Sequence, residues 1–319
     1  MKRFKKILYV ADPVVEQGEA FERAVTLAEK NDARLTIAEV FESIPSFITR
    51  QTPHNLRKLV HEHRKSELTK LCRSVRSRIK IEAEIYEGTF FLEVVRDVLR
   101  AGRDLVVKPI GGQGSGLGRL IGSNDMHLLR KCPCPVWLIK LPEDRSYRSI
   151  LAAVDFDDAD ESDVTGPLNR QILELSLSLA NSERSELHIC HAWKLPYEDL
   201  LRNQAGMPDE EVDAYVDEVE SDHQHRLESL TSQAKEWAGH EVYEAVRPKT
   251  HLERGYPQRV IPSLAQTLNA DLVVMGTVGR VGISGLFIGN TAESVADQLA
   301  CSLLAVKPPG YVSPVKLEE

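Results

Sequence analysis

The stretch DLVVMGTVGRVGISGLFIGNT, residues 271–291, decides the fold of this chain. Its first five residues form an apolar run typical of a short strand that is buried on both faces of a parallel sheet. The chain then becomes glycine-rich and turns helical after Thr291. Glycine exposes backbone amides to a ligand, and a helix N-terminus adds partial positive charge, so this pattern predicts a phosphate-binding loop. The glycines are Gly276, Gly279, Gly282, Gly285 and Gly289.

Two common phosphate-binding motifs do not match this loop. A P-loop requires a Gly-Lys pair, which occurs nowhere in the chain, and the dinucleotide motif GxGxxG follows a first strand rather than a late one. The spacing Gly276-x2-Gly279-x9-Gly289, followed by a small polar residue, resembles the ATP-binding motif of the universal stress protein family. That family places Ser or Thr after the last glycine, whereas this chain has Asn290 followed by Thr291.

Length and composition predict a two-domain globular protein. The chain has 319 residues, of which 42% are hydrophobic and 28% charged. Its formal net charge of −8 argues against nucleic acid as the main partner. The apolar run after the basic N-terminus covers only Ile7–Ala11, too short for a signal peptide or a membrane span. Five cysteines, an odd number, favour reduced thiols and a cytoplasmic location.

An internal repeat organises the chain. Residues 87–108 align without gaps on residues 254–275, an offset of 254 − 87 = 167 residues. The same offset relates Gly122 to Gly289 and Cys134 to Cys301. We expect one domain over residues 1–143 and a second over residues 144–319.

Apolar strands alternate with amphipathic helices in both halves, which predicts an α/β fold with parallel sheets covered by helices on both faces. Each half is expected to form an open five-stranded sheet of the Rossmann-like kind. The expected strands cover residues 6–11, 34–40, 79–86, 104–108, 136–140, 149–154, 185–192, a segment ending near 253, 272–275 and 302–307. The expected helices cover residues 18–30, 55–75, 90–101, 124–131, 167–180, 209–238, 258–268 and 292–299.

The family resemblance implies a nucleotide site at the strand ends of the second half. Asp155 would contact the nucleoside, Ala192 would pack on adenine, and the polarizable Met275 suits contact with a flat base. Any one of these residues alone can be explained by a local structural role, but the whole set favours nucleotide binding. The residues expected to hold ribose and phosphates are Gly276, Thr277, Gly279, Gly289, Asn290 and Thr291.

The first half departs from this pattern. The 167-residue offset places Lys108 where the second half has Met275, and Pro109 where it has Gly276. Proline has no N–H donor and fixes φ, so we favour a first half that has lost nucleotide binding and keeps the scaffold. The alternative is a pocket for another phosphorylated or acyl-bearing ligand. Its candidate residues are Asp12, Val40, Gly112, Gly122 and Ser123.

No catalytic or metal constellation is recognisable. The histidines and the Cys132-Pro-Cys134 turn lack metal-site spacing, so we expect no structural metal, although Mg²⁺ can accompany bound phosphates. His223, on the apolar stripe of the helix over residues 209–238, is expected to be a partly buried side chain with its hydrogen bonds satisfied. ATP hydrolysis would be slow or absent, and the alternatives to a nucleotide-responsive module are a weak ATP hydrolase or a pure scaffold.

The resemblance to tandem universal stress proteins covers nearly the whole chain. It implies two α/β domains packed as an intramolecular pseudo-dimer, with the possibility of a further homodimer. It also implies a cytoplasmic stress-response role with a nucleotide as ligand. The net charge and the lack of a long apolar run lead us to expect neither nucleic acid nor membrane as partner.

Overall fold

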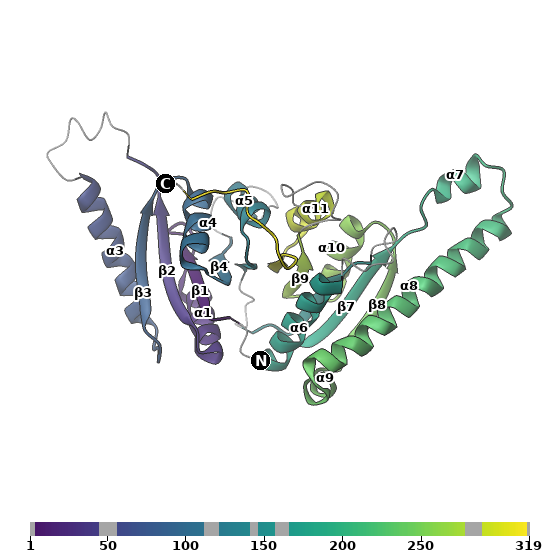
Figure 1. The fold of residues 1–319 in the computed structure, drawn as a ribbon, viewed down its shortest axis with the longest axis horizontal. Helices are drawn as coiled ribbons and strands as arrows, with labels where there is room; N and C mark the ends of the chain where they lie inside the picture. The colour runs from purple at the N-terminus through teal and green to yellow at the C-terminus, as the bar shows by residue number, and fades with distance from the viewer. Residues whose placement is uncertain are drawn as a thin grey trace.

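The computed structural model describes residues 4–44, 56–111, 121–140, 146–156, 166–277 and 289–317. Figure 1 shows two α/β halves side by side, with the first half in purple and blue and the second in green and yellow. The expected boundary between residues 143 and 144 falls outside the described residues.

The first half alternates strands and helices as the apolar pattern predicts. Glycine at position 102 ends α4 in the left-handed conformation, with φ of 62°, which is typical of helix C-termini. The elements in chain order are β1 (Lys6–Ala11), α1 (Gly18–Asn31), β2 (Arg34–Phe41), α3 (Leu56–Ser74), β3 (Ile81–Glu87), α4 (Phe90–Ala101), β4 (Leu105–Pro109), α5 (Ser123–Lys131) and β5 (Val136–Ile139).

The second half repeats this order with a longer helical excursion before its third strand. The predicted helix α8 has 30 residues, and α7 and α9 are two short helices beside it that the sequence analysis missed. The elements are β6 (Ser149–Val154), α6 (Gly166–Glu183), β7 (Glu186–Trp193), α7 (Glu198–Asn203), α8 (Asp209–Ala238), α9 (His240–Val246), β8 (Lys249–Arg254), α10 (Pro257–Thr267), β9 (Leu272–Gly276), α11 (Asn290–Gln298) and β10 (Ser302–Val306).

The two expected five-stranded sheets are joined into one. The strand order is β3-β2-β1-β4-β5-β10-β9-β6-β7-β8, so each half has the same internal order. All pairings within a half are parallel, whereas β5 and β10 pair antiparallel, with Leu138 opposite Leu303. The predicted α/β class is therefore confirmed, and the pseudo-dimer is built on backbone hydrogen bonds between the last strands of the halves.

Two apolar layers sandwich this sheet. One face packs against α1, α3, α6 and α8 through side chains such as Phe21, Leu68, Ile172 and Leu227. The opposite face packs against α4, α5, α10 and α11. We call this second side the α5/α11 face. Because side chains alternate along a strand, every second residue of each strand points to this face.

Polar contacts on either side of β5 and β10 fasten the halves together. The Nζ of Lys140, just after β5, donates to the carbonyl of Ala300 at 2.7 Å, and the Nζ of Lys307, just after β10, donates to the carbonyl of Leu129 at 2.6 Å. Each lysine thus binds carbonyls near the C-terminal end of a helix in the other half, where positive charge is favourable. The 167-residue offset relates Lys140 to Lys307, whereas the two carbonyls that they bind are not equivalent positions.

Candidate functional site

Three predicted ligand contacts of the second half meet at the carboxyl edge of the sheet. Asp155 follows β6, Ala192 lies near the end of β7, and Met275 lies near the end of β9. Met275 contributes to the apolar layer on the α5/α11 face, and the alternation of side chains places Asp155 and Ala192 on the same face. Ligands of open parallel sheets bind at such an edge, where the strand order changes direction.

The backbone of Asp155 is fixed by α6. Asp155 donates its N–H to Oδ1 of Asn169 at 3.2 Å, and Nδ2 of Asn169 donates to the carbonyl of Asp155 at 2.7 Å. The Asp155 carboxylate is solvent-exposed and accepts the N–H of Phe156 through Oδ1 at 3.0 Å. Asn169 is 2% exposed, and the sequence analysis did not identify it. Asn169 could have been found in the sequence as a polar residue on the otherwise apolar face of an amphipathic helix.

The two ends of the glycine loop are held together. Thr277 is buried and donates its N–H to the carbonyl of Val306 at 3.1 Å, while its own carbonyl accepts the N–H of Gly289 at 3.0 Å. Gly289 is the N-cap of α11, and Asn290 and Thr291 are the exposed first residues of that helix. The first N–H groups of a helix have no partner within it and can bind an anion. The predicted contact Gly279 lies outside the described residues.

Gly276 has a packing role that the sequence analysis did not foresee. A Cβ atom built on Gly276 would lie 2.7 Å from Cδ2 of Leu168, which belongs to α6. That helix covers the face opposite to Met275. The missing side chain therefore lets α6 approach the sheet, and any contribution of Gly276 to ligand binding comes from its backbone.

The corresponding place in the first half is filled by an ion cluster. The Nζ of Lys108 lies 3.0 Å from Oδ2 of Asp12 and 3.1 Å from Oδ1 of Asp125, the latter without hydrogen-bond alignment. It also donates to the carbonyl of Pro109 at 3.2 Å and lies 5.7 Å from the centre of the Phe90 ring. Lys108 is only 4% exposed, so the cluster occupies the interior of the site. We call Lys108, Asp12 and Asp125 the first-half ion cluster.

The other predicted residues of the first half keep the scaffold of the site. Val40 is half-buried near the end of β2, Pro109 ends β4, and Gly122 and Ser123 begin α5. Gly122 donates its N–H to Oδ2 of Asp125 at 3.0 Å, so this carboxylate binds a backbone amide at the start of the helix. The predicted contact Gly112 lies outside the described residues.

The sequence analysis noticed Lys108 but missed its partner Asp125. The 167-residue offset relates Lys108 to Met275 and Asp125 to Ala292, so two apolar residues of the second half correspond to an opposite-charge pair in the first. The replacement of two apolar residues by two opposite charges could be seen in the sequence. The sequence does not show that β4 and the first turn of α5 face each other across the site, so the two charges were not recognised as a pair.

The histidines of β7 bind other histidines instead of gathering around a metal site. Nε2 of His191 lies 3.0 Å from Nδ1 of His223 on α8, and Nδ1 of His188 lies 2.9 Å from Nε2 of His251 on β8. Burial lowers the pKa of His191 to about 4, with the neighbouring His223 acting in the same direction. His223 is 5% exposed, so it is more buried than expected. Among the described residues, no group of three His, Cys, Asp or Glu side chains could hold a metal ion.

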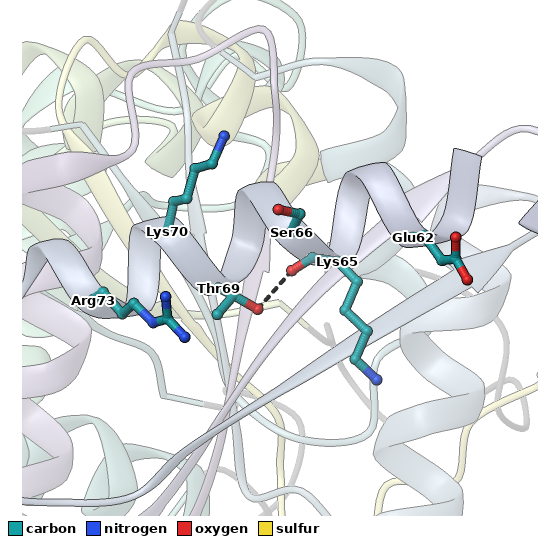
Figure 2. Close-up of a pocket in the computed structure, with 6 residues that line it drawn as sticks. All are labelled: Glu62, Lys65, Ser66, Thr69, Lys70 and Arg73. Atoms are coloured by element: carbon teal, nitrogen blue, oxygen red, sulfur yellow. Dashed lines mark hydrogen bonds between the residues drawn. The ribbon is translucent and has the colours of Figure 1, made fainter. Parts of the chain in front are cut away.

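A shallow hollow lies on the first half, away from the carboxyl edge of the second. Its lining comes from one helix, α3, and the Thr69 hydroxyl donates to the carbonyl of Lys65 at 2.7 Å within it (Figure 2). Side chains of a single exposed helix offer no convergent set of ligand contacts. The lining residues are Glu62, Lys65, Ser66, Thr69, Lys70 and Arg73. No described helix is long and apolar enough to cross a membrane.

Comparison with known sequences gives full-length matches. The chain is 30% identical over 327 residues to universal stress protein E of Escherichia coli strain K12, covering 100% of this chain and 99% of that protein. It is 28% identical over 318 residues to the universal stress protein E homolog of Haemophilus influenzae, covering 96% and 98% of the two chains.

Solved structures share the fold over nearly the whole chain. A functionally unknown protein from Pseudomonas aeruginosa PAO1 superposes with a TM-score of 0.67 at 23% identity, covering 96% of this chain and 94% of that one. A universal stress protein from Archaeoglobus fulgidus superposes with a TM-score of 0.60 at 16% identity, covering 95% and 98%. At these identities the likeness concerns the fold alone.

The sequence model of the universal stress protein family matches residues 3–140 and again residues 146–307. These two matches coincide with the two halves that share one strand order. The chain therefore belongs to the universal stress protein family and carries two copies of its domain in tandem.

Proposed function

We propose that this protein is a nucleotide-responsive binding module of the cytoplasm in which the second half holds ATP, with or without Mg²⁺, and the first half does not. One observation carries the proposal: the two halves have the same scaffold, but the equivalent place is lined by Met275 and Ala292 in one and filled by Lys108 and Asp125 in the other. An apolar wall accepts a flat base, whereas a buried ion cluster excludes it.

The charge of the two places supports the same assignment. The first-half ion cluster has one ammonium and two carboxylates, so its formal charge is −1, which repels a phosphate chain. The start of α11, in contrast, presents helix N–H groups next to the clamped end of the glycine loop. The exposed carboxylate of Asp155 lies at the same edge and suits hydrogen bonds to ribose hydroxyls.

The proposed role is binding rather than catalysis. A hydrolase needs a group that activates water, and no described residue of the second-half site forms a nucleophile–base pair. We therefore propose that ATP changes the surface presented to partners, and that any turnover is slow. All five cysteines are free thiols, in keeping with a reducing compartment.

Titration of the purified protein with ATP in a calorimeter, with and without Mg²⁺, tests the assignment. We expect one nucleotide per chain. Asp155→Ala should weaken binding by about 10- to 100-fold, because a hydrogen bond to a charged group contributes about 1.5–3 kcal/mol. The matched control is Asp12→Ala, which removes the carboxylate that follows β1 as Asp155 follows β6, and it should leave the affinity unchanged. Two nucleotides per chain, or a loss of affinity with Asp12→Ala alone, would overturn the assignment.

A further inference from the structure

A pair of thiols lies in the turn between α5 and β5. Cys132 and Cys134 flank Pro133, and their Sγ atoms are 3.6 Å apart. Cys132 is 0% exposed and Cys134 is 7% exposed. The sulfur atoms of a disulfide are about 2 Å apart, so closing the pair requires a modest movement within one turn. None of the site residues described above belongs to this turn.

A buried ammonium group accompanies the pair. Lys307 is 5% exposed, and its Nζ donates to the carbonyl of Leu129 and lies 4.7 Å from the centre of the Tyr311 ring. Among the described residues, no carboxylate forms an ion pair with it. Burial lowers the pKa of Lys307 to about 8, and a negative charge on Cys132 opposes that effect. An anionic Cys132 would therefore supply the countercharge that this ammonium lacks.

The two thiols have different roles in this environment. Burial raises the pKa of Cys132, but the Cys134 thiol, the Cys134 backbone and the Lys307 charge together bring it below the ordinary value. The hydrogen bond to Cys132, followed by burial, raises the pKa of Cys134. A thiolate is the nucleophile in thiol oxidation, so Cys132 is suited to attack and Cys134 to resolve.

The second half lacks this arrangement although it keeps the lysine. The 167-residue offset relates Cys132 to Leu299, Cys134 to Cys301 and Lys307 to Lys140. Binding of helix-end carbonyls explains both lysines, since Lys140 and Lys307 make the same kind of contact. This helix-end contact does not explain why the first half has Cys132, next to Lys307, where the second half has Leu299.

A C-terminal segment covers the turn. Oη of Tyr311 donates to the carbonyl of Arg130 at 2.6 Å, and Oγ of Ser313 donates to the carbonyl of Lys131 at 2.7 Å. In Figure 1 this yellow segment leaves the second half and runs past α5 toward the first. These two hydrogen bonds and the packing of Val315 hold the segment beside the thiols, and we infer that peroxide reaches them when the segment detaches locally.

We propose that Cys132 and Cys134 form a peroxide-responsive site that closes to an intramolecular disulfide, with Lys307 stabilising the attacking thiolate. The Cys132 thiolate attacks one oxygen of hydrogen peroxide, the O–O bond breaks, and the released hydroxide takes up the proton that Cys132 lost, giving water. Cys132 is now a sulfenic acid. Sγ of Cys134 attacks Sγ of Cys132, the S–O bond breaks, and the leaving hydroxide takes the Cys134 proton, giving a second water.

Peptide mass measurement after peroxide treatment of the full-length reduced protein tests this. Trypsin cleaves after Lys131 and Lys140, which releases the peptide CPCPVWLIK with both cysteines and no others. After denaturing alkylation, we expect this peptide to have lost two hydrogens and to carry no alkyl group until it is reduced. The half-buried Cys72 should still be alkylated at the same dose. A peptide 132–140 that is alkylated twice while Cys72 is oxidised would overturn the proposal.

Variants separate the roles of the three residues. Cys134→Ser should stop at a sulfenic acid on Cys132 that a 1,3-dione probe captures, and Cys132→Leu, which installs the residue of the second half, should abolish oxidation of the peptide. Lys307→Met should slow closure about three- to fourfold for each unit by which the pKa of Cys132 rises, because the loss of thiolate is partly offset by its higher nucleophilicity. The matched control is Lys140→Met, which removes the other lysine contact to a helix end without touching a thiol pair; in this variant trypsin releases both cysteines on the longer peptide 132–145. Equal rates of disulfide closure in the two lysine variants would refute the role of Lys307. If a variant does not fold, the mass of peptide 132–140 from the peroxide-treated wild-type protein still shows whether the disulfide forms.

Discussion

Replacing the first-half ion cluster by the residues of the second half gives the sharpest test of why the halves differ. Lys108→Met alone should lower the free energy of unfolding by about 3–5 kcal/mol, because it leaves a buried carboxylate without its partner. That carboxylate is Asp125, whose side chain is 7% exposed. The cost is large because the opposite-charge contact at 3.1 Å is lost while the burial remains.

Asp125→Ala should cost less, about 1–2 kcal/mol. It removes the buried carboxylate together with its contact to Lys108 and its hydrogen bond from Gly122, and Lys108 keeps Asp12 at 3.0 Å as a partner. The double variant recreates the Met–Ala pair of the second half. It should also cost only about 1–2 kcal/mol, since a buried ion pair replaced by apolar groups is often close to neutral. The two substitutions should therefore compensate each other by about 4 kcal/mol.

Urea denaturation of the wild type, both single variants and the double variant measures this coupling as a double-mutant cycle. The control cycle uses Lys70 and Glu67 on α3, an exposed pair at 2.7 Å whose side chains are 67% and 50% exposed. Its coupling should be too small to measure reliably, because solvent screens an exposed ion pair. If the Lys108–Asp125 coupling is as small as that of the surface pair, the ion cluster does not hold the first-half site closed and the reasoning fails.

Three further predictions use the second half. Burial lowers the pKa of His191 to about 4 in the folded protein, against 6.5 for an ordinary histidine. The unfolded chain therefore binds a proton that the folded protein does not, so the free energy of unfolding is highest above about pH 6.5 and should fall by up to about 3 kcal/mol as the pH drops to about 4. Chemical denaturation at several pH values should give a flatter profile for His191→Gln than for the wild type. Gly276→Ala should destabilise the protein by about 1–3 kcal/mol, because the new Cβ would lie 2.7 Å from Cδ2 of Leu168. Adding Leu168→Ala should remove this clash. A melting temperature of the double variant equal to that of Leu168→Ala alone supports the packing role of Gly276. Met275→Lys with Ala292→Asp transplants the pair of the first half and should abolish ATP binding in the calorimeter with the circular dichroism spectrum retained; undiminished affinity would contradict the proposed site.

The sequence alone determined the duplicated α/β architecture and the position of the glycine loop. Apolar runs alternating with amphipathic helices allow few topologies, because parallel strands need right-handed helical crossovers. The predicted strand over residues 272–275 and the predicted helix over residues 292–299 appear as β9 and as α11, which begins two residues earlier, at Asn290. The assignment of a ligand to this loop stays a prediction, as do the roles of Asp155, Ala192 and Thr277.

Only the tertiary structure decided how the halves join and what fills the first-half site. Antiparallel pairing of β5 with β10 joins residues that are 165 or more positions apart in the sequence, and no local pattern specifies it. The contact between Lys108 and Asp125, the approach of Leu168 to Gly276, and the place of Lys307 beside Cys132 likewise join different elements. Local propensity fixes the elements because their hydrogen bonds and apolar periodicity lie within short segments, whereas these contacts arise only when packing brings distant segments together.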